Sequence, residues 1–256
     1  MSRILLFLSL AFCFVLASNS GFAQGTYITA HFGYGFGSGT QRIAATQNES
    51  SMEGIYGSFG EGPKSGASAG HMFSTNIGME LGLSYWPGKT FEWSTTDGPS
   101  RTSESAYGSG FVITPAVVIS SGMQTVTPYA RVGLVLGLLK VTDETTSSET
   151  NQPTQEYTFE ETGGLAVGYS GAIGVVISTS GTVDFFAEVD LQSVTHSPST
   201  IELTRYTVGG VDELYMVQNT TYNTEESIPI DSRNSVLAMR NPFSSIGITV
   251  GMRIDL

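Results

Sequence analysis

The feature that most constrains this chain is the strict alternation of its last twelve residues. Within 245–256 every even position is apolar, whereas the odd positions carry small or charged residues, namely Ser245, Gly247, Thr249, Gly251, Arg253 and Asp255. A period of two predicts a β-strand whose two faces meet different surroundings. If the apolar face meets lipid, the polar face must line a closed barrel, because lipid leaves no sheet edge unpaired.

The same alternation recurs along the chain and predicts about eight strands. They are expected at 26–36, 66–73, 77–86, 107–120, 129–138, 163–177, 183–191 and 245–256. Ala, Ser and Gly dominate the second segment, so the pattern does not show which of its side chains lie on the apolar face of the sheet. The polar connections between strands alternate long and short. This order is typical of an all-β, closed, antiparallel, up-and-down transmembrane barrel with long outer loops and short periplasmic turns.

Composition agrees with a membrane barrel. Glycine makes up 31 of 256 residues and charged residues only 13%, about half the charged fraction of a soluble domain. The net charge of −12 disfavours nucleic acid and anionic lipid surfaces as partners. A soluble lipocalin-like barrel is the alternative fold, and it requires the apolar faces to point inward.

The amino terminus has the parts of a secretory signal. Arg3 provides a positive start, 4–17 is apolar, and small residues at Gly21 and Ala23 suit cleavage before Gln24. We therefore expect a cleaved signal peptide at 1–23, one domain at 24–256, and export to the bacterial outer membrane. Cleavage would remove Cys13, the only cysteine, so no disulfide is expected.

Two segments resemble a known superfamily. These are Asn76-Ile77-Gly78-Met79-Glu80-Leu81-Gly82-Leu83-Ser84-Tyr85 and Thr127-Pro128-Tyr129-Ala130-Arg131-Val132-Gly133-Leu134. They resemble the small outer-membrane β-barrels of OmpA, OmpX and OmpW, and the resemblance extends over the chain after the signal. It implies the barrel architecture but no single activity. The final Leu256 departs from the aromatic residue that commonly ends the family's last strand.

The inward-facing positions carry charges of both signs. We predict a network of salt bridges among Glu80, Arg131, Glu188, Asp190 and Arg253. A barrel of about eight strands has an interior that side chains just fill, and an unpaired charge there costs several kcal/mol. A plugged interior follows, and a narrow porin-like channel gated by Glu80 and Arg131 is the alternative.

Chemical sites are weakly indicated. His196 with Ser193, Ser197 or Ser199 would be the candidate for an outer-membrane lipid-modifying enzyme, but neighbouring residues of a strand point to opposite faces. We therefore expect no enzyme, no cofactor and no metal site. The acidic pairs Glu160–Glu161 and Glu225–Glu226 suit a solvated surface, or divalent ions bridging to lipopolysaccharide.

The longest connection, 192–242, contains a second alternating stretch. We predict a projecting hairpin there, with Tyr206, Leu214 and Tyr215 as residues that contact a partner. The expected function is a monomeric cell-surface protein in outer-membrane lipid and lipopolysaccharide. Its role is structural or one of adhesion and recognition, carried by the long loops. A narrow OmpW-like channel for small solutes is the alternative.

Overall fold

The computed structural model describes residues 25–38, 41–48, 50–123, 125–228 and 234–256, so the predicted signal segment lies outside the described residues. The described chain is all-β, and its only helical element is the short 3₁₀ helix η1 (Leu214–Met216). No helix among these residues has the length and apolar character needed to cross a membrane.

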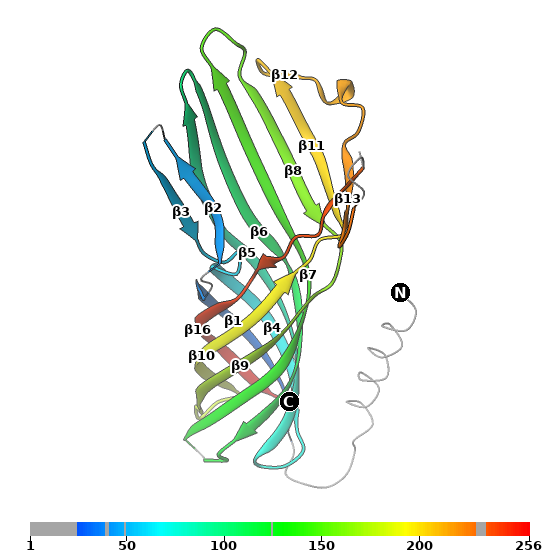
Figure 1. Ribbon diagram of the computed structural model, residues 1–256. Helices are drawn as coiled ribbons and strands as arrows, with labels where there is room; N and C mark the ends of the chain where they lie inside the picture. The colour runs from blue at the N-terminus through cyan, green and yellow to red at the C-terminus, as the bar shows by residue number, and fades with distance from the viewer. Residues whose placement is uncertain (1–24, 39–40, 49, 124, 229–233) are drawn as a thin grey trace.

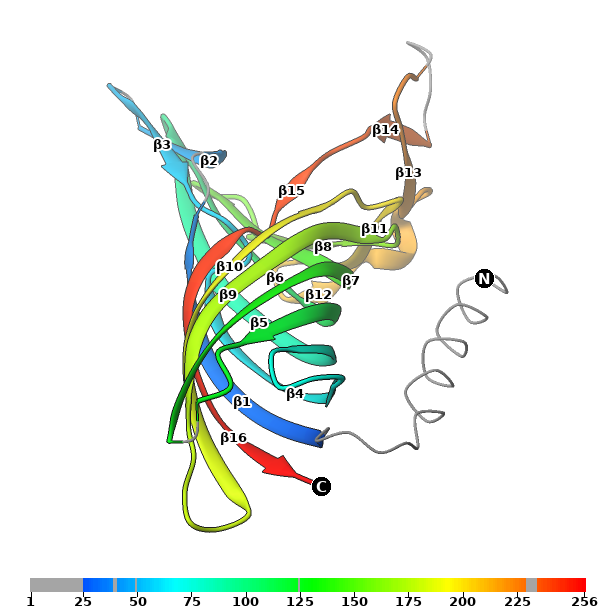
Figure 2. The same ribbon diagram turned by 90° about the horizontal axis from the view of Figure 1, so that it is seen from below.

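Eight of the described strands form a ring of antiparallel pairs, which can be followed in Figures 1 and 2. Each strand pairs with the next, and the last, β16, pairs with β1. In ring order they are β1 (Thr26–Gly37), β4 (Gly62–Met72), β5 (Ile77–Asp97), β6 (Ser100–Ser120), β7 (Val126–Glu149), β9 (Ala166–Ile177), β10 (Val183–His196) and β16 (Ser245–Asp255). All eight predicted segments are strands.

The sheet is larger than predicted. Over the described residues it has sixteen strands and is mixed, since β13 pairs parallel with β14 and β2 pairs parallel with β5. Strands β5, β6 and β7 continue past the ring, through stretches that the sequence analysis treated as polar connections. The other strands are β2 (Arg42–Gln47), β3 (Met52–Tyr56), β8 (Gln155–Thr162), β11 (Thr200–Val208), β12 (Val211–Asp212), β13 (Thr221–Glu225), β14 (Ser235–Leu237) and β15 (Asn241–Pro242).

We call the part of the sheet beyond the ring the projecting sheet (Figure 1). It contains the distal halves of β5, β6 and β7 together with β8, β11 and the short strands beside them. Its residues are rich in Thr, Ser and Glu, and Thr is a good strand former even without apolar alternation. Backbone pairing along the extended hairpins holds this region, for example from Thr90↔Tyr107 to Asp97↔Ser100.

The two faces of the ring have opposite character. Large apolar side chains point outward and are exposed on seven of the eight ring strands, all but β4, including Leu83 (53%), Leu134 (59%), Ile173 (67%) and Ile248 (56%). Polar and charged side chains such as Glu188, Asp190 and Thr249 point inward and are buried. The apolar faces therefore do not point inward, as the lipocalin-like alternative requires.

Closure of the ring can be tested with a disulfide. Ala30 of β1 lies directly opposite Met252 of β16, at a separation that a disulfide spans. In a Cys13→Ser background, we expect Ala30→Cys/Met252→Cys to cross-link on mild oxidation and to shift gel mobility. Ala30→Cys/Ile248→Cys is the control, because Ile248 lies opposite Tyr34, about 13 Å further along the strands. Equal cross-linking of both pairs would contradict the register.

Candidate functional site: the filled interior and the projecting sheet

Three of the five predicted network residues meet inside the ring. Arg131 of β7 lies between Glu80 of β5 and Glu188 of β10. Its Nη1 donates to Oε1 of Glu80, and its Nη2 donates to Oε1 of Glu188 over 2.6 Å. The side chains of Glu80 and Glu188 are only 8% and 2% exposed. Two buried carboxylates therefore share one guanidinium, whose planar fork can donate to both.

Two tyrosines complete this network. Tyr27 Oη donates to Oε2 of Glu80 over 2.9 Å, and Tyr129 Oη donates to Oε2 of Glu188 over 2.7 Å. Every carboxylate oxygen of the pair thus has a donor, which offsets the cost of burial. Alternation places both tyrosines on the inward face, but sequence reasoning did not assign them this role.

Asp190 has a different partner from those predicted. Its Oδ1 pairs with Nζ of Lys64 on β4 at 3.3 Å, and its Oδ2 accepts from Thr249 Oγ1 at 3.0 Å. Lys64 Nζ also donates to Ser245 Oγ at 2.7 Å and to Gln192 Oε1 at 3.2 Å. The sequence analysis began this strand at residue 66, whereas β4 begins at Gly62, so Lys64 was missed.

Arg253 also lies apart from the Arg131 network. Its Nε and Nη2 donate to Oδ1 of Asp255 over 2.8 and 2.7 Å, and its guanidinium stacks on the ring of Tyr27 at 3.9 Å. The predicted single network is therefore wrong for Asp190 and Arg253. Among the described residues, the buried charges form one group around Arg131 and another around Lys64, whereas Arg253 pairs with the half-exposed Asp255.

The Arg131 network lies between two small cavities of the ring interior. One, of about 40 Å³, is lined by residues that include His31, Lys64 and Arg131. The other, also about 40 Å³, is lined by residues that include Tyr27, Arg131 and Arg253. A buried water needs roughly 10–15 Å³ of such space, so each cavity holds a few waters at most.

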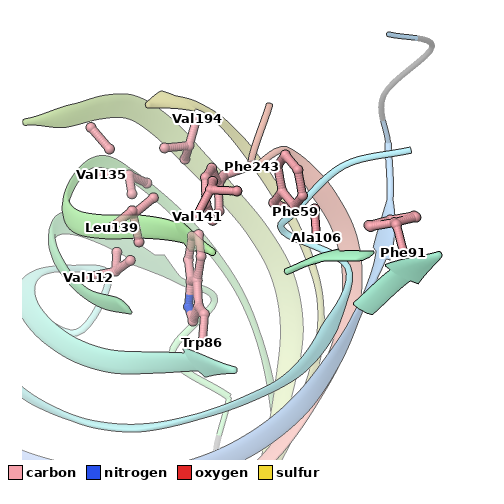
Figure 3. Packing of buried hydrophobic residues seen from close by; sticks show 11 residues of the cluster. Phe59, Trp86, Phe91, Ala106, Val112, Val135, Leu139, Val141, Val194 and Phe243 are labelled. Carbon is pink, nitrogen blue, oxygen red and sulfur yellow. The ribbon is translucent and has the colours of Figure 1, made fainter. Parts of the chain in front are cut away.

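An apolar cluster fills the ring interior on the side toward the projecting sheet (Figure 3). Lys64 Nζ lies 5.2 Å from the ring centroid of Trp86, so the cluster begins directly beside the Lys64 group. Its members come from five ring strands and two connections: Phe59, Trp86, Phe91, Ala106, Val112, Val135, Leu139, Val141, Ala166, Val194 and Phe243. We call it the apolar cap.

Phe243 anchors the long 197–244 connection in this cap. It is fully buried, its N–H donates to the carbonyl of Val194 over 2.9 Å, and its ring packs 5.7 Å from that of Phe59. A Cβ on Gly60 would lie 2.1 Å from the Phe243 carbonyl oxygen, and one on Gly108 would lie 2.6 Å from its ring. These two glycines permit the close approach that seals the ring.

Two carboxyl groups lie just beyond the cap, at the base of the projecting sheet. Asp143 of β7 and Glu161 of β8 share a hydrogen bond, and Asn241 Nδ2 donates to Glu161 Oε2 over 2.5 Å. Burial, and then the negative charges of Glu161 and Glu104, raise the pKa of Asp143 to about 7. Burial also raises the pKa of Glu161.

The predicted hairpin exists in part. Thr207 pairs with Asp212 and Val208 with Val211 around a turn of two positive-φ glycines. Tyr206 lies in β11 and stacks on Tyr157 at 4.9 Å. Leu214 and Tyr215 lie in η1 and not in the returning strand, which corrects the prediction for those two residues.

His196 is enclosed by the protein and contacts a backbone carbonyl and an aromatic ring. It is fully buried, one ring nitrogen bonds the carbonyl of Gly163 at 2.9 Å, and its edge packs on Phe243. Among the residues that the structure describes, no cluster of three His, Cys, Asp or Glu side chains is suited to a metal ion.

Glu160, a member of one of the acidic pairs named from the sequence, forms an ion pair with Lys140 at 2.9 Å.

Comparison with known proteins finds neither a matching protein-family model nor a matching curated protein. The geometry of the filled interior and the surface of the projecting sheet therefore carry the functional argument.

Removing Arg131 should strongly destabilise the ring. Arg131→Leu leaves two buried carboxylates without a counter-ion, so we expect a loss of about 3–5 kcal/mol. The measurement is urea unfolding of the refolded chain. The control is Arg205→Leu, which breaks the exposed Arg205–Glu156 pair (62% and 42% exposed) and should cost under about 1 kcal/mol. Similar losses in both variants would contradict the assigned role of Arg131.

The raised pKa of Asp143 predicts a pH-dependent stability. The folded chain keeps a proton that the unfolded chain releases, so stability falls as the pH rises from about 4 to about 7. Asp143→Asn should raise the melting temperature at pH 8, with a gain that shrinks toward pH 4. Asp97→Asn, at the exposed distal turn of the same sheet, is the control. A pH-independent effect of Asp143→Asn would contradict this account.

Proposed function

We propose that this chain is a bacterial outer-membrane β-barrel with a closed interior, whose projecting sheet presents a binding surface to another macromolecule. The observation that carries the proposal is the inverted distribution of side chains. Apolar residues face outward around the ring, and paired charges face inward. Such an outer wall is costly in water and suited to lipid, where every strand must also be paired.

The height of the apolar wall supports the membrane assignment. On β16 the outward apolar positions run from Ile246 to Ile254, about 27 Å along the strand at roughly 3.4 Å per residue. With a strand tilt of ~40° this gives about 21 Å along the membrane normal, close to the ~25 Å apolar band of such barrels. On β7 the outward row changes from Leu138 to Lys140, which fits the edge of the band.

The projecting sheet supports the surface role. Val211 in β12 and Tyr215 and Met216 in η1, which lie beyond the ring (Figure 1), are 61%, 79% and 65% exposed. We call these three residues the tip patch. Exposed aromatic and Met side chains at the end of a polar sheet are the kind of group that anchors protein interfaces.

The resemblance to the OmpA, OmpX and OmpW superfamily remains part of this proposal. The inward Glu80 and Arg131 come from the two segments that carry that resemblance, and their pairing supports a plugged interior. The proposal also includes export directed by the signal at 1–23 and insertion into the outer membrane as a monomer.

The proposal is tested by expressing the full chain in a Gram-negative host. We expect it in the outer-membrane fraction, with an electrophoretic mobility that changes on boiling, and with protease cleavage on intact cells confined to the projecting sheet. A soluble chain without a heat shift would refute the barrel.

The surface role is tested in the same cells. Val211→Ser/Tyr215→Ser/Met216→Ser should keep the heat shift and lower adhesion to other cells and to immobilised matrix proteins by about tenfold, the effect of losing roughly 1.4 kcal/mol. Met52→Ser, equally exposed on β3 (63%), is the matched control and should adhere like the parent. Unchanged adhesion of the triple variant would refute the tip patch.

A further inference from the structure

The net charge of this chain is distributed unevenly between the ring and the part beyond it. Four segments run beyond the ring, namely 38–61, 88–106, 140–162 and 197–244. They hold 18 of the 23 Asp and Glu residues and 7 of the 11 Lys and Arg residues, which gives them a formal charge of −11 out of −12 for the whole chain. Nearly all of the net negative charge therefore lies outside the apolar wall.

Few of these acidic groups are neutralised by the protein itself. Among the described residues, the ion pairs beyond the ring are Lys89–Glu61, Lys140–Glu160 and Arg205–Glu156. These three pairs already use most of the basic residues that the described part of the four segments contains. Most of the acidic side chains there consequently have no basic partner, and the part beyond the ring presents a negative surface.

The tip patch lies among acidic residues of this kind. Asp212 and Glu213 stand between Val211 and Tyr215 in the sequence, and neither forms an ion pair with another described residue. Asp212 Oδ1 accepts a hydrogen bond from the N–H of Leu214 over 3.0 Å, which holds this carboxylate beside η1. The side chain of Tyr215 is 79% exposed. An exposed aromatic ring with carboxylates near it attracts Lys and Arg side chains.

The turns beside the tip patch add further negative charge. The N–H of Gly209, in the turn between β11 and β12, donates to the carbonyl of Thr154 over 2.8 Å, so this turn adjoins the connection between β7 and β8. Glu149 ends β7 and pairs with Ser100, at the turn between β5 and β6, where Asp97 ends β5. Both Glu149 and Asp97 are exposed. Three neighbouring turns thus present carboxylates to the same partner.

We propose that the partner of the tip patch is a basic protein, whose Lys and Arg side chains surround an apolar contact with the patch. The inference rests on the proposed function, because it names the partner of the surface proposed there. The negative surface raises the rate of encounter with a cationic partner. The exposed apolar side chains, with a cation stacked on Tyr215, then hold the complex together.

The same charge disfavours the other occupants of an exposed patch. A nucleic acid, an acidic polysaccharide and an anionic lipid surface are all repelled by a part of the chain with a formal charge of −11. A second copy of this chain would bring a surface of the same sign against the patch, and like charges that face each other across an interface are costly. A cationic partner is favoured where each of these is opposed.

The test measures binding of the full chain, refolded in detergent, to purified matrix proteins coated separately by surface plasmon resonance. One set of coated proteins is basic and the other is acidic. We expect the chain to bind the basic set, with an association rate that falls about tenfold from about 0.05 M to about 0.5 M salt, because salt screens the attraction. Equal binding to both sets, or an association rate that does not depend on salt, would overturn the proposal.

Two opposite charges in one hairpin give a test of sign. Asp97 and Arg101 lie on the two sides of the turn between β5 and β6, both exposed and neither in an ion pair among the described residues. Asp97→Asn should lower the association rate about twofold and Arg101→Gln should raise it about twofold, with little change in dissociation, because charges at the rim of an interface act mainly on encounter. Changes in the same direction would contradict the proposal.

Failure of this inference is distinguishable from failure of the proposed function. If Val211→Ser/Tyr215→Ser/Met216→Ser weakens binding while salt and the two charge variants leave the association rate unchanged, the surface role stands and the basic partner is refuted. If that triple variant binds like the parent, the surface role itself fails. A dimer mass that the triple variant abolishes would instead identify a second copy as the occupant.

Discussion

The structure depends on one requirement: charges enclosed by the ring must find partners within it. Eight strands enclose a space that side chains just fill, so a carboxylate there cannot keep its hydration shell. Arg131 meets the requirement for Glu80 and Glu188, with a hydroxyl from Tyr27 and one from Tyr129 on the remaining oxygens. The network joins strands on opposite sides of the ring and leaves room for only a few waters on either side.

A second means of closure lies toward the projecting sheet, and it is apolar. Phe243, Phe59 and Trp86 pack in one cluster (Figure 3), and Lys64 Nζ lies 5.2 Å from the ring centroid of Trp86. Because Phe243 belongs to the longest connection and contacts Gly60 and Gly108, the cap also fixes where that connection enters β16. The interior of the ring is thus filled by ion pairs and, at the end toward the projecting sheet, by the aromatic packing of the apolar cap. This arrangement directs the search for function to the outer surface, above all to the tip patch.

Much of this could be predicted from alternation alone. The period of two located all eight ring strands, and parity placed Glu80, Arg131 and Glu188 on one inner face. It failed where alternation is weak. In β4, Ala, Ser and Gly hide the start of the strand, so Lys64 was treated as part of a connection and Asp190 was given the wrong partners. Arg253 was assigned to the Arg131 network, but its side chain donates to Asp255, which is only two residues away.

The projecting sheet shows a different limit of sequence reading. Its strands are held by backbone pairing over polar residues, which alternation of hydrophobicity does not detect. The pairing of β11 with β12 ends at Thr207↔Asp212, and the apolar residues that follow, Leu214 and Tyr215, lie in η1. The most direct test of the central claim is single-channel recording of the refolded chain in a planar bilayer. We expect stable insertion with no discrete conductance from the parent, and channel openings once Trp86→Ala/Phe243→Ala removes the cap and Arg131→Ala breaks the network. Steady discrete conductance from the unaltered chain would contradict a closed interior.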